Sequence, residues 1–152
     1  MDLSKGFWQV PLTAGASELS AFAPPDGLYQ CRYMPFGMRN SPATFQRLMN
    51  KVIESVPGCV VYVDDIVLYS DSWSHHRAQL GKLLAALAGA GLVVNLKKCS
   101  FGKATVEYLG HTVGSGRVKP CSAKIEAIMG LEQPKGHRNQ CWRLHSLIDR
   151  SP

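Results

Sequence analysis

The chain has 152 residues, of which 45% are apolar and 18% charged, so it suits one globular domain and not a disordered protein. A formal net charge of +6 leaves two alternatives, an anionic partner such as nucleic acid or a solvated basic surface. The five cysteines form no C-x-x-C pair, which argues against a disulfide framework or a zinc site and favours an intracellular location. No apolar run is long enough to span a bilayer, so we expect no membrane partner.

The first part of the chain predicts strands, a turn and a helix. Residues 1–12 have the pattern of a strand, and residues 20–34 predict two strands around a Pro-Pro-Asp-Gly turn. Residues 41–56 predict an amphipathic helix with Ser41 as its N-cap and Pro42 at its first helical position. Pro57-Gly58 ends this helix, and its apolar stripe consists of Phe45, Leu48, Met49, Val52, Ile53 and Val56.

The second part begins with residues 59–70, CVVYVDDIVLYS, which predict a strand, a tight turn and a strand. A second helix starts near Asp71 or Ser72 and ends at Gly89 or Gly91. Short strands broken by glycine follow over residues 92–120, and a last short helix covers about residues 122–129. This irregular alternation predicts an α+β fold with helices on one face of a sheet. The apolar stripe of the second helix consists of Leu80, Leu83, Leu84 and Leu87.

Two adjacent carboxylates, Asp64 and Asp65, stand between the apolar flanks of that hairpin. Asp is common in turns, so one interpretation is an ordinary hairpin turn. The other is a metal site, because hard divalent cations prefer oxygen ligands and neutralise the repulsion between the two charges. Such a site needs a third carboxylate, for which Asp2 is the candidate. Three converging carboxylates can hold two Mg²⁺ ions for phosphoryl transfer, with Mn²⁺ as a substitute.

Five sequence blocks follow one another over about residues 1–135: MDLSKGFWQVPL, MPFGMRNSPATFQRLM, YVDD and GLVVNLKKCSFGKATVEYLGHTV, the last of which covers two blocks. YVDD resembles the Tyr-x-Asp-Asp signature of reverse transcriptases, and the other blocks resemble that family's first catalytic block and the blocks that flank the signature. Their order and spacing resemble those of gypsy-like LTR retrotransposons, which are related to retroviruses.

The resemblance implies a polymerase palm, an antiparallel sheet backed by two helices. The palm would cover residues 1–118, and residues 119–135 would begin the connection to a thumb. We expect the fragment to be incomplete, because relatives carry a fingers segment before the first block and a thumb after residue 135. Residues 136–152 lack the thumb pattern, and we expect a frameshifted or poorly ordered tail.

The resemblance assigns catalysis and metal binding to Asp2, Asp64 and Asp65, which would hold two Mg²⁺ ions during the transfer of a deoxyribonucleotide to a primer 3′-hydroxyl. Phe7 matches the ring that excludes a 2′-hydroxyl, and the alternative is a core aromatic. For Trp8, which lies next to it, we favour the core. Phe36 and Gly37 would form the floor of the nucleotide site, where Gly permits close backbone approach.

Further residues match template and primer contacts: Gln46, Tyr62, Tyr108, Leu109, Gly110 and His111. A solvent-facing side chain is an equal alternative for Gln46, and strand packing is the alternative for Tyr108 and Leu109. Lys97 or Lys98 resembles a general acid toward pyrophosphate, the alternative is plain attraction to phosphate, and two lysines in a loop are more often solvated than catalytic. Arg32, Arg39 and Arg47 could touch phosphates, whereas the histidines show no metal-ligand spacing.

Two functions of different classes follow from these residues. The first is an RNA-directed DNA polymerase fragment, whose partners are an RNA or DNA template-primer and deoxynucleoside triphosphates. The rest of a pol polyprotein (ribonuclease H, integrase and protease) lies outside this chain, and the setting would be a cytoplasmic particle or the nucleus. The second is an inactive relic that binds nucleic acid through its basic surface. A two-metal nuclease is weaker, because it leaves the other blocks without a purpose.

Overall fold

The computed structural model describes residues 1–130 and divides the chain into two compact units, Met1–Phe101 and Gly102–Pro152, the second described as far as Gly130. The structure therefore places a boundary after Phe101, and the predicted palm boundary at residue 118 stays a prediction. The predicted tail over residues 136–152 lies outside the described residues. No helix of the described part is long and apolar enough to cross a membrane.

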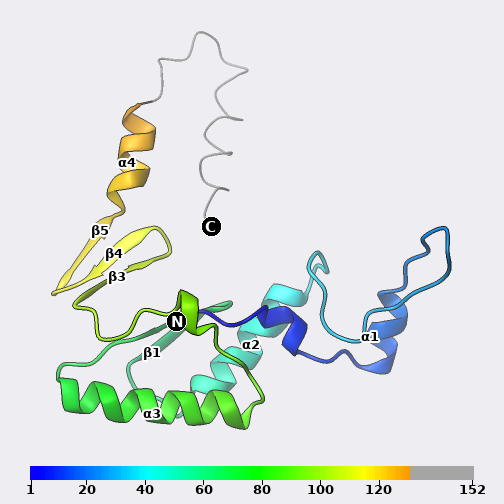
Figure 1. Cartoon of the computed structure of the whole chain (residues 1–152), viewed down its shortest axis with the longest axis horizontal. Helices are drawn as coiled ribbons and strands as arrows, with labels where there is room; N and C mark the ends of the chain where they lie inside the picture. Colours follow the sequence, from blue (N-terminus) through cyan, green and yellow to red (C-terminus); the bar gives the residue numbers. More distant parts are fainter. Residues whose placement is uncertain (131–152) are drawn as a thin grey trace. The chain divides into compact units, whose positions relative to one another are not determined.

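A short antiparallel sheet forms the centre of the first unit (Figure 1). Strands β1 (Cys59–Tyr62) and β2 (Asp65–Leu68) pair as the predicted hairpin. The first residues of the chain lie along the other edge of β2, where the Ile66 N–H donates to the Met1 carbonyl at 2.8 Å. Residues 93–95 pair with the outer side of this segment through the Leu3–Val94 bridge. Segments far apart in the sequence thus form one antiparallel arrangement.

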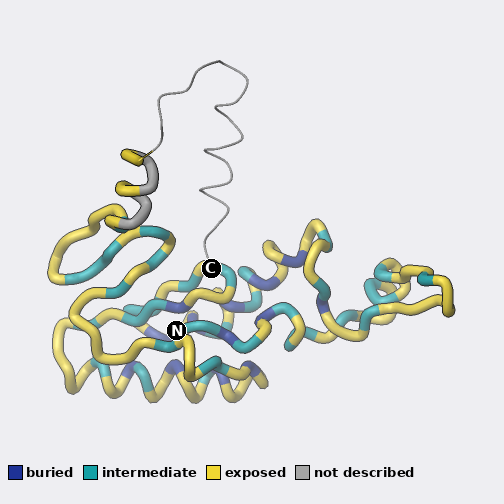
Figure 2. The backbone as a smooth tube through the Cα atoms, turned by 45° about the horizontal axis from the view of Figure 1, so that its top comes forward, coloured by how far each residue is buried: buried dark blue, intermediate teal, exposed yellow. Residues whose placement is uncertain are grey.

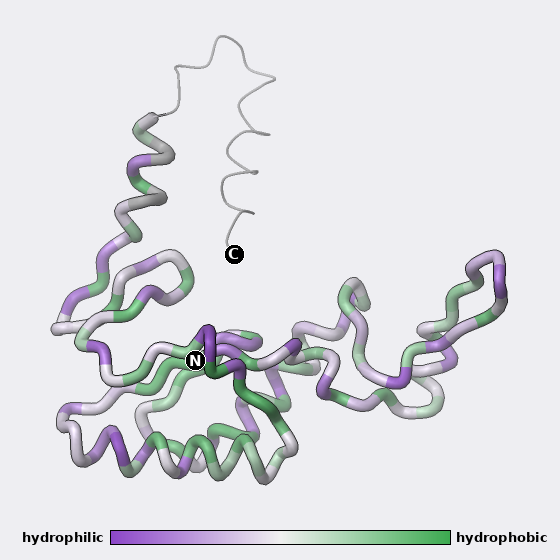
Figure 3. Tube along the Cα trace, in the orientation of Figure 1, coloured by the Kyte–Doolittle hydropathy of each residue, from purple (hydrophilic) through white to green (hydrophobic). Residues whose placement is uncertain are grey.

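Two helices cover this sheet, as the resemblance implied. Helix α2 (Ser41–Ile53) packs on β1 and on helix α3 (Trp73–Gly89), which also packs on β2. Figure 3 shows that apolar residues concentrate in the second half of α3 and in the segment after it. The buried positions of Figure 2 lie where these elements face each other. The core consists of Leu3, Phe45, Met49, Ile53, Val56, Ile66, Leu83, Leu87 and Leu92.

Several local predictions for the helices need correction. Helix α2 already begins at Ser41, so Asn40 is its N-cap, without a side-chain capping bond, and the buried Ser41 hydroxyl donates to the Pro35 carbonyl at 3.4 Å. On α3, Ser72 is the N-cap as predicted, and its hydroxyl accepts from the His75 N–H at 3.3 Å. Leu84 of the predicted stripe is 39% exposed, and Gln79 takes a buried place instead. The stripe therefore lies about one position away from its predicted centre.

A long excursion separates the first segment from α2. It contains η1 (Gly6–Gln9) and α1 (Ala14–Leu19), a helix that periodicity did not reveal because it is short and lacks an apolar stripe. The two strands predicted over residues 20–34 are reduced to isolated bridges, Phe22–Tyr29 and Pro11–Tyr33. The predicted turn is present, with the Gly27 N–H donating to the Pro24 carbonyl at 3.1 Å.

After η2 (Leu96–Lys98), the second unit is a three-stranded antiparallel meander followed by a helix. The turn between its first two strands has positive φ at Leu109 and Gly110, as a tight primed hairpin turn requires. The predicted short strands and last helix are confirmed as β3 (Thr105–Tyr108), β4 (His111–Gly114), β5 (Arg117–Pro120) and α4 (Ser122–Met129).

Candidate active site

The fold brings the three predicted carboxylates to one end of the central sheet. Asp2 and Asp65 are antiparallel bridge partners, and Asp64 precedes Asp65 in the turn of the β1–β2 hairpin. Side chains of directly opposed antiparallel residues leave the same face of a sheet, with Cβ atoms about 4.5–5.5 Å apart. Asp2 and Asp65, which are 63 positions apart in the sequence, therefore present acidic groups to the same face, as the metal-site interpretation requires.

The negative charges of these neighbouring carboxylates affect the pKa of Asp65. The pKa of Asp65 is raised, first by burial and then by the negative charges of Asp64 and Asp2. Lys98 offsets part of this charge, since its Nζ lies 3.8 Å from Asp2 Oδ2, although the lysine side chain is 65% exposed. A surface pair of this length contributes little stability. The N-terminal ammonium of Met1 and Lys98 thus both offset part of the negative charge at Asp65.

The donor set suits a hard cation but does not enclose one. Carboxylate oxygens are the ligands that Mg²⁺ prefers, and here Asp2 and Asp65 lie opposite each other with Asp64 in the adjoining turn. Within residues 1–130, however, no group of three or more His, Cys, Asp or Glu side chains is arranged so that it could hold a metal ion. Mg²⁺ commonly binds through one or two carboxylates and the phosphates of a substrate, without an all-protein cage. The residues present fit that mode of binding.

The hairpin that carries Asp64 has an unusual backbone. Val63 takes a positive φ of 54° at the first central position of a two-residue turn, where glycine is the usual residue. For a β-branched side chain this conformation is an outlier that persists only when its surroundings hold it. Gln46 supplies such a hold, because its Oε1 accepts from the Val63 N–H at 2.7 Å and its Nε2 donates to the Val61 carbonyl at 3.0 Å. Gln46 contacts the hairpin and is not a free solvent-facing side chain.

Phe7 packs against two other aromatic rings. The Phe7 ring makes edge-to-face contacts with Phe45 in the core, at 5.1 Å between centroids, and with Phe36, at 5.3 Å. Phe36 is 65% exposed, and Gly37 has a φ of 90° with nothing within 4 Å of an added Cβ, so both are accessible and their part in a nucleotide floor stays a prediction. The core position favoured for Trp8 is wrong, since this ring is 48% exposed.

The remaining predicted contacts are spread over both units. In the first unit, Tyr62 is 56% exposed at the end of β1, and Lys97 is exposed on η2. In the second unit, Tyr108 and His111 face each other across the β3–β4 turn, where His111 Nδ1 lies 3.1 Å from the Leu109 carbonyl. The histidines at the start of α3 have hydrogen-bond partners, His75 with Gln79 and His76 with Ser70.

Three residues that lie on or contact the first segment of the chain escaped sequence reasoning. A Cβ added to Gly6 would lie 2.9 Å from Phe45 Cζ and 3.4 Å from Asp64 Cβ. Gln9 joins the segment after Asp2 to residue 93, with its Oε1 accepting from the Val93 N–H at 2.6 Å. Cys99 Sγ lies 3.5 Å from the Asp2 nitrogen. No local pattern could have identified them, because each acts on a part of the chain that only folding brings near.

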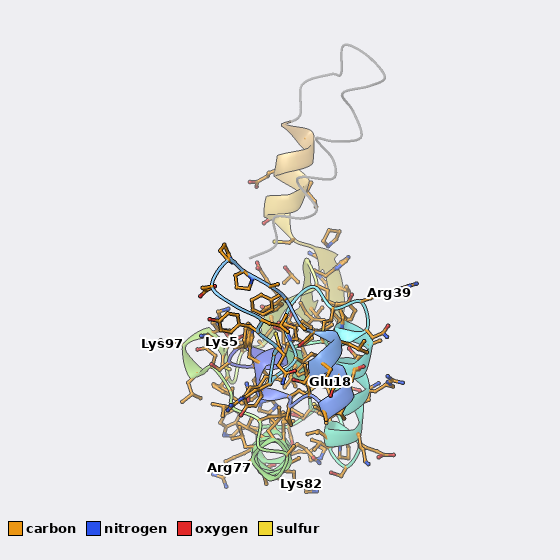
Figure 4. The ribbon with its side chains drawn as sticks, turned by 90° about the vertical axis from the view of Figure 1, so that its right-hand side faces the viewer. Lys5, Glu18, Arg39, Arg77, Lys82 and Lys97 are labelled. Carbon is orange, nitrogen blue, oxygen red and sulfur yellow. The ribbon has the colours of Figure 1, made fainter. Side chains whose placement is uncertain are left out.

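Positive charge is spread around the first unit. Figure 4 shows Arg39 and Lys97 on opposite sides of the first unit, and Arg77 and Lys82 near its lower end. Arg47, a predicted phosphate contact, donates a hydrogen bond from Nη2 to Thr44 Oγ1 at 3.4 Å. This distribution fits sequence-independent attraction to a polyanion and gives no sign of one focused patch among the labelled side chains.

The sequence matches a known family and curated relatives. The pattern of the family described as reverse transcriptase (RNA-dependent DNA polymerase) covers residues 1–113. The chain is 38% identical over 136 residues to the retrovirus-related Pol polyprotein from transposon 297 of Drosophila melanogaster, and 34% identical to that from transposon gypsy. It is 30% identical over 140 residues to the transposon Tf2-3 polyprotein of Schizosaccharomyces pombe. These matches cover 88%, 88% and 91% of this chain but only 13%, 13% and 10% of the relatives.

Solved structures show the same fold. A foamy viral protease-reverse transcriptase in complex with RNA/DNA hybrid matches with a TM-score of 0.79 and 32% identity, over 88% of this chain and 18% of that chain. The dRH form of that protein in complex with double-stranded DNA matches with a TM-score of 0.84 and 30% identity, over 96% and 25%. These structural matches confirm the expected mixture of helices and antiparallel sheet.

Proposed function

Because this chain belongs to the reverse transcriptase family of retrotransposon Pol polyproteins, we propose that it carries out RNA-directed DNA synthesis by two-metal nucleotidyl transfer. The observation that carries the proposal is the pairing of Asp2 with Asp65 beside Asp64, at the rim of a sheet backed by two helices. An ordinary hairpin turn has no need of a third carboxylate from a segment that is distant in the sequence.

The proposed roles follow from what each side chain contacts. Asp2, Asp64 and Asp65 would hold divalent cations, which reverse transcriptases in general use, and these would neutralise the reacting phosphates and activate the primer hydroxyl. Phe7, fixed between Phe45 and Phe36, would bring its ring against the sugar and exclude a 2′-hydroxyl. Lys98 is near enough to Asp2 to attract the triphosphate or to give a proton to the leaving pyrophosphate.

The partners are proposed from the same comparisons. Two of the matched foamy viral structures hold an RNA/DNA hybrid or double-stranded DNA, which supports a template-primer duplex as the partner of this chain. The curated relatives are polyproteins of which the chain spans about an eighth or less. We therefore expect deoxynucleoside triphosphates as substrates and further domains of a Pol polyprotein as neighbours.

An inactive nucleic-acid-binding relic is the second candidate. It is favoured by the spread of basic side chains and by the lack of an enclosed metal-ligand group among residues 1–130. In this case the carboxylates would weaken binding to phosphate through repulsion, and affinity would fall with salt without any chemistry.

Primer extension on an RNA template with Mg²⁺ separates the two candidates. The variant Asp64→Asn removes one proposed ligand, and Asp26→Asn makes the same change in the exposed turn before Tyr29. We expect nucleotide incorporation by the parent and by Asp26→Asn, and none by Asp64→Asn. Salt-sensitive binding without incorporation in all three proteins would support the relic instead.

A further inference from the structure

Gln46 on helix α2 holds the backbone of the hairpin that presents Asp64. We propose that Gln46 is a positioning residue whose amide fixes the strained turn at Val63 and thereby sets the direction of the two following carboxylates. The proposal rests on the proposed function for its purpose, but the hold itself is independent of metal and nucleic acid. Its support comes from hydrogen bonding, from backbone conformation and from the anchoring of α2.

The hydrogen bonds leave Gln46 in one orientation. The Val63 N–H can only donate, so it must face Oε1, at 2.7 Å. The Nε2 group then points at two acceptors, the Val61 carbonyl at 3.0 Å and Asn50 Oδ1 at 2.8 Å. The amide therefore bonds to the outer edge of β1 on both sides of Tyr62, where the backbone of a further strand would otherwise bind.

The turn needs this support because of its geometry. The strain energy of a β-branched residue with positive φ is of the same order as the free energy of the hydrogen bonds that hold it. The backbone at this residue therefore relaxes when those hydrogen bonds are removed. Val63 directly precedes Asp64, and the closing pair of the hairpin is Tyr62 with Asp65. A change in the Val63 backbone therefore re-aims the doublet while the rest of the ladder stays paired.

The helix that carries Gln46 is itself fixed. Phe45 and Met49, on the same helix, are both fully buried in the core. The amide is thus anchored to the packed interior on one side and to the hairpin on the other. Asn50, four residues further along α2, holds the second Nε2 proton and prevents the amide from rotating. Such anchoring makes Gln46 a rigid support and not an adaptable surface group.

The test compares Gln46→Met, which keeps the length of the side chain and removes the amide, with Gln30→Met, the same change at an exposed glutamine. Amide hydrogen exchange and backbone chemical shifts are measured by NMR on the whole chain without metal or nucleic acid. In Gln46→Met we expect about tenfold faster exchange at the Val63 amide, the effect of one lost hydrogen bond, and shifted Asp64 and Asp65 resonances. In Gln30→Met neither should change.

A second pair of variants keeps the proposal open to refutation if Gln46→Met folds poorly. Gln46→Glu retains the acceptor for Val63 and loses the donor to Val61, so protection at Val63 should persist. Val63→Gly removes the strain, and in this background Gln46→Met should shift Asp64 and Asp65 less. Unchanged exchange at Val63 in Gln46→Met, or equal shifts in both backgrounds, would overturn the proposal. Failure of primer extension alone would refute the polymerase assignment and leave this inference intact.

Discussion

Replacing Gly6 by Ala should destabilise the first unit, although the backbone at Gly6 has no positive φ that would demand glycine. The new Cβ would lie 2.9 Å from Phe45 Cζ, whereas carbon atoms in contact prefer about 3.5–4.0 Å. Phe45 is fully buried, so its ring can relieve the clash only by displacing its packed neighbours, and the new Cβ would also lie 3.4 Å from Asp64 Cβ.

The size of the effect follows from two opposing contributions. Overpacking a well-packed core costs about 1–3 kcal/mol. The loss of glycine entropy from the unfolded chain returns about 0.4–1 kcal/mol. The centres of these two ranges differ by about 1.3 kcal/mol, which is the net loss that we expect in the free energy of unfolding. Urea denaturation followed by circular dichroism measures it as a shift of the midpoint to lower urea at an unchanged slope.

Gly81→Ala is the matched control for this experiment. Gly81 lies inside α3 with open space around it, so the same change should stabilise the protein by about 0.5–1 kcal/mol. The double variant Gly6→Ala with Phe45→Leu should lose less than the sum of the single changes, because the smaller side chain removes the clash. A Gly6→Ala protein as stable as the parent would refute the argument from packing, and so would equal effects at the two glycines.

Two titratable groups give further predictions. The folded-state pKa of Asp65 is raised, so the protonated side chain favours the folded state and ionisation opposes it. Without divalent ions, Asp65→Asn should have a higher free energy of unfolding than the parent at pH 7. This difference in stability should vanish as the pH falls toward 3.8. A difference in stability that is independent of pH would contradict the prediction. Burial raises the pKa of the Cys59 thiol from 9.0 to about 11, so at pH 8 its thiolate fraction falls about hundredfold. Iodoacetamide should modify Cys59 rapidly only after unfolding in urea, and equal rates in both states would count against its burial.

The local elements were largely predictable from the sequence. Apolar spacing, the Pro42 start and the Ser72 cap placed both long helices, because these signals act within a few residues along the chain. Helix α1 is not predictable from apolar spacing, since its six residues carry no apolar stripe. The exposure of Trp8 is not predictable either, because an aromatic residue type alone does not reveal whether other residues pack against the ring. Burial depends on neighbours that the local pattern does not name.

The sequence by itself determined the family and the hairpin with its acidic doublet. It also identified Asp2 as the candidate for a third carboxylate. Only the tertiary structure decided that Asp2 pairs with Asp65, that Gln46 holds Val63 and that Lys98 approaches Asp2. The physical reason is range: helix and turn signals come from adjacent residues, whereas these contacts join segments that the shared core of α2, α3 and the sheet draws together.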